Sequence, residues 1–194
     1  RQQPQKHEMT QKKLVLLIAL EQEISPKLVP PDVYLKYSGV GKINAAIAAA
    51  EIHMELGPEI EIVNIGTCGS AKHPPGTILH CNQFIQMDMD ATPAGLAMGE
   101  TPFSDLPPVL KFGDAHTSAV ICGSADRFQT DIPMSVDCVE MEAFAIATVC
   151  AKYQIPFRAI KVVSDQGGES GHNVWVEFLE NKMSGIFEEI RATL

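Results

Sequence analysis

A continuous apolar run at residues 14–19 (LVLLIA) constrains the fold of this chain more than any other sequence feature. A strand-length run without a polar position predicts a β-strand covered on both faces, which is the pattern of α/β proteins. Further buried strands are predicted at residues 60–65 and 155–163, and another strand at residues 76–87. Helices are predicted at residues 43–56, 141–153 and 175–193; a glycine turn at 38–42 opens the first of them, and Gly57-Pro58 ends it. The sequence therefore predicts an α/β fold built on a buried sheet.

Length and charge limit the classes of protein to consider. The 194 residues suit one domain, with a flexible polar segment expected at residues 1–13 and the folded domain at residues 14–194. A net charge of −9 and only four arginines argue against nucleic acid or an anionic membrane as a partner. No stretch reaches the ~18 apolar residues of a membrane span, and no signal peptide is visible. These features indicate a cytoplasmic protein.

The cysteines and histidines predict no metal site. The five cysteines are odd in number and contain no C-x-x-C pair, and the six histidines are scattered and unpaired. We expect reduced, buried thiols that serve as small apolar side chains, surface or core histidines, and no metal or other cofactor.

Two glutamates two residues apart mark a candidate site. Glu140 and Glu142 lie where an extended segment (136–139) passes into the helix predicted at 141–153, which is apolar almost all round. The helix dipole stabilises an anion in the first turn by only ~0.3–1 kcal/mol, whereas burying an ion costs several kcal/mol. Either the two glutamates are exposed, or ligand hydroxyls, water or a cation must compensate their burial.

Polar residues follow four predicted strands, at the edge where open α/β sheets bind ligands. They are Glu23, the dipeptide Gly66-Thr67, the pair Glu140 and Glu142, and Asp165. Three separate acids at one edge suggest acid–base chemistry. The glycine segment at residues 66–69 either cradles an anion with backbone N–H groups or makes a tight strand-to-helix connection. It matches neither a P-loop nor a dinucleotide-binding fingerprint.

Four motifs follow one another in a specific order. They are S-G-V-G-K at residues 38–42, G-T-C-G at 66–69, V-E-M-E-A at 139–143 and V-S-D at 163–165. Together they resemble the purine nucleoside phosphorylase/nucleosidase superfamily, in particular the 5′-methylthioadenosine/S-adenosylhomocysteine nucleosidases of methionine salvage. The resemblance implies a single-domain, three-layer α/β/α fold with a central mixed, mostly buried sheet. It also implies a homodimer that acts on a small-molecule purine nucleoside.

The resemblance assigns roles to the matching residues. Glu142 is expected to hold the ribose hydroxyls, with Met141 packing on the sugar. Thr67 is expected near the sugar and the attacking water. Asp165, oriented by Ser164, is expected to read the purine at N7 and N6.

Further residues match the family with some departures. Glu23 matches the residue that activates water, and Phe128 resembles the aromatic that stacks on the base. Lys161 and Trp175 stand at substrate-binding positions where nucleosidases usually have an arginine and a phenylalanine. The proline-rich segment 88–112 is expected to be irregular and to suit subunit packing. Within it, residues 90–96 lack the aromatics expected around an alkylthio group.

Hydrolysis is favoured over phosphorolysis by two observations. Phosphorylases of this superfamily carry an arginine two residues before the glycine segment, where this chain has Asn64. Glu23 would repel phosphate but could polarise water. We hypothesise that Asp165, kept protonated by burial, protonates N7 of adenine while Glu23 takes a proton from water. The alternatives are a purine nucleoside phosphorylase and a nucleoside-binding protein with little turnover.

Overall fold

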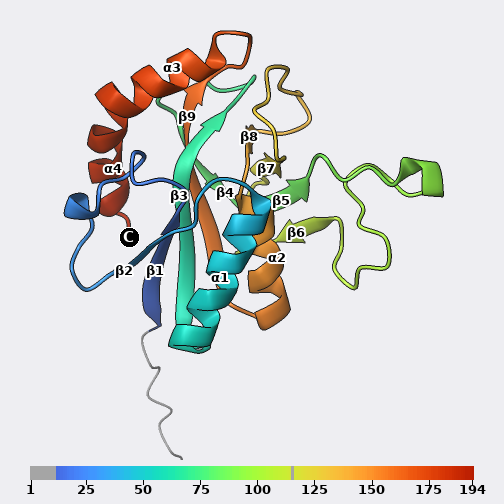
Figure 1. Cartoon of the computed structure of the whole chain (residues 1–194), viewed down its shortest axis with the longest axis horizontal. Coiled ribbons are helices and arrows are strands. Elements are labelled where there is room, and N and C mark those ends of the chain that lie inside the picture. Colours follow the sequence, from blue (N-terminus) through green and yellow to red (C-terminus); the bar gives the residue numbers. More distant parts are fainter. Residues whose placement is uncertain (1–11, 115) are drawn as a thin grey trace, which may run out of the picture.

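The predicted apolar strands form the centre of the sheet (Figure 1). The computed structural model describes residues 12–114 and 116–194. Three parallel strands lie side by side, with β3 (Ile60–Gly69) between β1 (Lys13–Ile18) and β9 (Phe157–Asp165). Val15 and Leu17 of β1 face one helical layer and Leu16 and Ile18 face the other. Burial on both faces explains why this run has no polar position.

The sheet is mixed, as expected. The other strands are β2 (Tyr34–Tyr37), β4 (Ile78–Cys81), β5 (Gln83–Gln86), β6 (Val109–Lys111), β7 (Ile121–Ser124) and β8 (Cys138–Glu140). Within the described residues, the order is β2-β1-β3-β8-β7-β5-β6, and β9 joins β3 to β4. The pairs β3/β8, β4/β9 and β5/β6 are antiparallel, whereas the remaining pairs are parallel.

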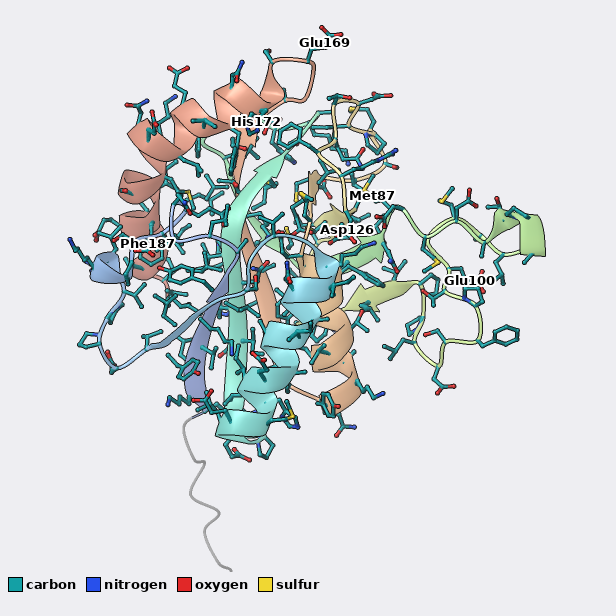
Figure 2. All side chains as sticks on the ribbon, in the orientation of Figure 1. Met87, Glu100, Asp126, Glu169, His172 and Phe187 are labelled. Carbon is teal, nitrogen blue, oxygen red and sulfur yellow. The ribbon has the colours of Figure 1, made fainter. Side chains whose placement is uncertain are left out.

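Helices cover both faces of this sheet (Figure 1). α1 (Lys42–Leu56) and α2 (Ala143–Tyr153) pack on one face, where buried alanines allow close approach. α3 (Gly171–Phe178), a π-helical segment (Leu179–Met183) and α4 (Ser184–Arg191) cover the other. Phe187 of α4, labelled in Figure 2, is buried there against apolar residues of the central strands. The predicted three-layer α/β/α architecture is confirmed.

The glycine turn before α1 is also confirmed. Gly39 and Gly41 have φ angles of 81° and 96°, and Gly41 is the residue before the helix. These left-handed or mirror-extended conformations favour glycine because it has no Cβ. Gly57, with φ of 76°, ends the helix as predicted.

The glycine segment at residues 66–69 is not the tight strand-to-helix connection that was one of its two expected roles. It lies inside β3, pairs with β9 across a register shift at Cys68/Gly69, and is followed by β4 rather than a helix. A Cβ added to Gly66 would lie 3.1 Å from Glu23 Oε1, and one added to Gly69 would lie 3.2 Å from Asp165 Oδ1. These glycines therefore allow two acids to approach the strand closely.

Three other boundaries differ from the sequence prediction. The strand expected from residue 76 to 87 is broken at Asn82, whose side chain bonds to Ser118 O (3.0 Å) and accepts from Val120 N (2.9 Å). β4 therefore pairs with β9, whereas β5 pairs with β6 and β7. The last helical region begins at Gly171 rather than Trp175, and β1 already includes Lys13.

The segment between β5 and β6 projects away from the sheet, and Figure 2 marks Glu100 on it. It is irregular, as expected, except for a short 3-10 turn at Thr92–Ala94. The flexible segment predicted at residues 1–13 lies mostly outside the described residues, as does His7. No helix in the described parts of the chain is long and apolar enough to cross a membrane.

Candidate active site

A cavity of about 240 Å³ brings together most of the predicted site residues. Eight of the nine line it: Glu23, Thr67, Phe128, Met141, Glu142, Ser164, Asp165 and Trp175. Lys161 does not. They come from the loop after β1, the loop between β7 and β8, the ends of β3, β8 and β9, and α3. The acids meet at one cavity, as expected. Their strands do not all run in one direction, because β8 is antiparallel to β3.

Glu23 is held by donors on both of its carboxylate oxygens. Oε1 accepts hydrogen bonds from the backbone N and the hydroxyl of Thr67, both at 2.8 Å, and Oε2 accepts from Leu20 N at 3.3 Å. The residue is only 6% exposed. Its carboxylate is thus fixed beside β3 while still lining the cavity.

Trp175 sets the direction of the Thr67 hydrogen bond. The indole Nε1–H donates to Thr67 Oγ1 at 2.9 Å, and an indole nitrogen can only donate. Thr67 Oγ1 therefore accepts from Trp175 and has its single proton available for Glu23. Trp175, which was expected at a substrate-binding position, therefore also orients Glu23, the residue predicted to activate water.

Asp165 is held at the end of β9. Oδ1 accepts from Gly167 N at 2.9 Å, and Oδ2 lies 2.9 Å from Ser164 Oγ. Ser164 Oγ also lies 3.1 Å from the carbonyl oxygen of Cys68. The predicted orienting contact between Ser164 and Asp165 is therefore present.

Glu140 is buried in a network that satisfies its charge. Oε2 accepts from Lys161 Nζ at 2.9 Å and from the backbone N of Glu142 (3.0 Å) and Ala143 (2.8 Å). Ser124 Oγ donates to Oε1. Burial opposes ionisation of Glu140, but the Lys161 charge and these donors outweigh it and lower the pKa of the carboxyl. Glu140 thereby satisfies two of the free N–H groups at the start of α2.

Lys161 lies behind this carboxylate, away from the cavity. It is 1% exposed, and although burial acts to lower the pKa of its amine, Glu140 raises that pKa above the ordinary lysine value. Lys161, which was predicted to bind substrate, contacts Glu140 and does not line the cavity. Its distance along the chain from Glu140, 21 residues, left no local signal of this pairing.

Glu142 is buried with less compensation. Its Oε1 accepts from Gly41 N at 2.8 Å, the backbone group supplied by the glycine turn before α1. Burial, followed by the nearby charge of Glu140, raises the pKa of Glu142 to about 8. Both glutamates are 7% exposed, so the alternative of exposed first-turn residues is wrong. The unfilled hydrogen-bonding capacity of Glu142 is directed at a cavity.

Aromatic rings form another part of the site. Phe128, 43% exposed, meets His172 edge-on at 6.0 Å, and His172 lies 5.5 Å from the Trp175 ring. Figure 2 labels His172 at the beginning of α3. The sequence analysis treated His172 as one of several scattered histidines and missed its place between two site aromatics. Only its spacing of three residues from Trp175 could have suggested a shared helix face.

Arg127 was not predicted as a site residue either. It is the only cation among the described residues that line the cavity, beside Glu23, Glu140, Glu142 and Asp165. Arg127 directly precedes Phe128 in the sequence, and this position was the available signal that it belongs to the site. The cavity is therefore strongly acidic, which favours neutral or cationic ligands over an inorganic anion.

Comparison with known proteins agrees with the motifs. A model of the family described as the phosphorylase superfamily matches residues 27–192. Among curated relatives, the 5′-methylthioadenosine/S-adenosylhomocysteine nucleosidase of Staphylococcus haemolyticus is 30% identical over 177 residues, covering 79% of this chain and 77% of the relative. The enzyme of the same name from Marinomonas is 28% identical over 176 residues, covering 77% and 74%.

Solved structures have the same fold. The Neisseria meningitidis 5′-methylthioadenosine/S-adenosylhomocysteine nucleosidase, in complex with methylthio-immucillin-A, superposes with a TM-score of 0.75 at 25% identity, covering 93% of this chain and 99% of that chain. The futalosine hydrolase of Helicobacter pylori gives a TM-score of 0.80 at 19% identity, covering 95% and 99%. Since the family model spans most of the sequence, the chain belongs to the phosphorylase superfamily and, like these relatives, to its nucleosidases.

Proposed function

We propose that this protein hydrolyses the N-glycosidic bond of an adenine nucleoside, with 5′-methylthioadenosine and S-adenosylhomocysteine as the first candidate substrates. The observation that carries the proposal is that Glu23, from the loop after β1, and Asp165, from the end of β9, line one cavity together with Glu142. The names of the curated relatives support this substrate class. Futalosine is a further candidate, supported only by similarity of fold.

Glu23 is proposed as the general base. Each of the three groups that contact its carboxylate is a donor, so the carboxylate remains an acceptor and keeps a free lone pair for water. Proton abstraction by a positioned carboxylate typically contributes ~10²–10⁴-fold to rate. Glu142 is proposed to accept hydrogen bonds from the ribose hydroxyls and to stabilise the positive charge that develops on an oxocarbenium-like sugar.

Asp165 is proposed as the general acid that protonates the purine. Ser164 Oγ donates to Asp165 Oδ2 at 2.9 Å and also lies 3.1 Å from the carbonyl oxygen of Cys68. These contacts hold the Asp165 carboxyl group at the end of β9, where it lines the cavity. From there Asp165 is proposed to give a proton to N7, which makes adenine a better leaving group.

Hydrolysis fits the site better than phosphorolysis. A bound phosphate needs several cationic or N–H donors, whereas the cavity holds one exposed arginine and four carboxylates. The Thr67 N–H that might have bound phosphate already donates to Glu23. The Asn64 amide, at the position of the phosphorylase arginine, donates to Leu17 O inside the sheet. No separate observation favours a binding protein without turnover.

The decisive experiment is a product assay. The protein is incubated with 5′-methylthioadenosine, S-adenosylhomocysteine, adenosine and inosine, with and without phosphate, and bases are separated by chromatography. We expect phosphate-independent release of adenine. Glu23→Gln should bind nucleoside but lose turnover, whereas Glu21→Gln, an exposed acid of the same loop, should retain it. Release that requires phosphate, or full activity of Glu23→Gln, would reject the mechanism.

We also propose a homodimer that packs through α1. Ile43, Ile47 and Met54 are 73%, 53% and 75% exposed, and their spacing places them on one face of the helix. A contiguous apolar face of this kind marks an interaction surface. Light scattering should show a dimer, and Ile47→Lys should shift it to monomer.

The buried free cysteines are consistent with a reducing location such as the cytoplasm.

A further inference from the structure

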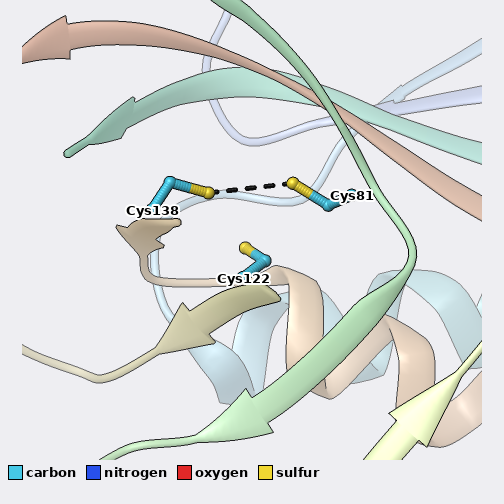
Figure 3. A group of neighbouring side chains, drawn as sticks. All are labelled: Cys81, Cys122 and Cys138. Atoms are coloured by element: carbon cyan, nitrogen blue, oxygen red, sulfur yellow. Dashed lines mark hydrogen bonds between the residues drawn. The ribbon is translucent and has the colours of Figure 1, made fainter. Parts of the chain in front are cut away.

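Three cysteines that are far apart in the sequence meet in the core (Figure 3). Cys81 ends β4, Cys122 lies in β7 and Cys138 begins β8, and their side chains point toward one another. The Sγ atoms of Cys81 and Cys138 are 3.7 Å apart, and all three Sγ atoms lie within 4.8 Å of one another. Each residue is at most 2% exposed.

We propose that these three thiols bind one monovalent, thiophilic metal ion of the copper(I) type. An ion about 2.3 Å from each of three sulfurs at the corners of a triangle requires sulfur separations of about 4.0 Å. The observed separations, from 3.7 Å to no more than 4.8 Å, bracket this value. Small rotations about χ1 would therefore suffice to close the site. The absence of a C-x-x-C pair had argued against a metal, but here the ligands come from three strands.

Charge balance favours a monovalent ion. All three cysteines are free and buried, and a thiol in apolar surroundings favours its neutral form. When the ion binds, one thiol loses its proton, a metal–sulfur bond replaces the S–H bond, and the proton leaves to solvent. The net charge of the core is then unchanged. A divalent ion with three thiolates would leave one negative charge in apolar surroundings, which is costly.

Coordination number also distinguishes the candidate ions. Structural zinc sites have four protein ligands, but among the described residues no fourth Cys, His or acid lies within 4.8 Å of all three sulfurs. Soft thiolates select copper(I) among the common metals of lower coordination. Cys68 lies close enough to Cys138 to affect its pKa and lines the substrate cavity. It therefore marks the side from which an ion could enter the core.

The cluster is joined to the active site through two strands. Cys122 precedes Ser124 by two residues on β7, and Cys138 precedes Glu140 by two on β8. Residues two apart face the same side of a strand. An ion held by the thiols would thus brace the two strands that position the Ser124–Glu140 hydrogen bond. This predicts that the bound ion stabilises the folded state.

The test uses silver(I), a redox-inert ion of the same charge class, and copper(I) under anaerobic conditions. The reduced, chelator-treated protein is loaded with each ion, passed through gel filtration and assayed for metal and for melting temperature. We expect one ion per chain and a raised melting temperature. Cys122→Ala removes one of three direct ligands and should weaken binding by more than the ~10–100-fold that loss of an outer-shell partner costs. The matched control is Cys150→Ala, a buried cysteine outside the cluster, which should bind as the native protein does.

Several outcomes would overturn the proposal. They are the absence of a retained ion, equal loss of binding in Cys150→Ala and Cys122→Ala, or zinc retained in preference to both monovalent ions. A Cys81–Cys138 disulfide formed in place of a metal complex would also overturn it. The melting curves of the metal-free variants show whether they fold. If Cys122→Ala does not fold, Cys138→Ser provides the second test. Because the readout is bound metal, the result is independent of the proposed reaction.

Discussion

Replacing Lys161 by methionine is expected to lower the free energy of unfolding by about 3–5 kcal/mol, because it leaves the Glu140 carboxylate buried without its counterion. The two side chains are each 2% exposed and meet at 2.9 Å. Methionine keeps most of the apolar length of lysine, so the cavity it creates is small. The expected loss is a large fraction of the 5–15 kcal/mol typical of a native domain.

The structure narrows the range expected for the loss of unfolding free energy in Lys161→Met. Ser124 and the backbone N–H groups of Glu142 and Ala143 would still donate to Glu140 in the variant, so we expect a value near the lower end. The matched control is Arg158→Met on the same strand. Arg158 meets Glu61 at 2.8 Å, but these side chains are 36% and 34% exposed. Solvent screening should limit that loss to less than about 1 kcal/mol.

Urea unfolding at several pH values is the assay. In the native protein the pKa of Glu140 is lowered, so its stabilising contribution is present above the unfolded pKa of about 4.3 and is lost as pH falls through the folded pKa. Without Lys161, burial should raise the folded pKa, and the variant should lose stability as pH rises above about 4.3. The difference in the free energy of unfolding between the native protein and Lys161→Met should therefore be small in acid and reach its full value at neutral pH. Equal stability of Lys161→Met and Arg158→Met at neutral pH would refute the reasoning.

Three changes at the cavity test the proposed reaction. Trp175→Phe removes the N–H that orients Thr67, so kcat should fall by about 10-fold, the equivalent of one hydrogen bond of ~1.4 kcal/mol; a change confined to KM would contradict this role. Glu142, with a pKa of about 8, should hold sugar hydroxyls best when ionised, so the Kd of a non-hydrolysable nucleoside measured by calorimetry should fall as pH rises through about 8. A flat profile would exclude that contact. Gly66→Ala places a carbon 3.1 Å from Glu23 Oε1 and should reduce kcat by at least about 10-fold with little change in melting temperature; unaltered turnover would show that the position of Glu23 is not critical.

Local sequence patterns predicted the framework of the fold. The apolar run at residues 14–19 became β1 because its alternate residues face two helical layers. Gly41 and Gly57 set the ends of α1, since their φ angles are positive and rarely adopted by other residues. These properties depend on a residue and its close neighbours, so the sequence alone determines them.

The motifs identified most of the cavity but not how it is assembled. Glu23, Glu142 and Asp165 line it as predicted. For the motif at residues 66–69, the sequence left open an anion cradle or a tight turn, because glycine commonly occurs in both. Its glycines instead provide space for acids that approach from other segments. A missing side chain gives no local indication of which distant group will occupy the space.

The sequence by itself determined where strands, helix ends and acids occur along the chain. Only the tertiary structure decided which of them meet: Lys161 with Glu140, Trp175 with Thr67, and Cys81 with Cys138. These partners lie 21, 108 and 57 residues apart, far beyond the periods of two and 3.6 residues that local patterns report. Their contacts, and the pKa changes that follow from them, arise when the sheet places its strands side by side.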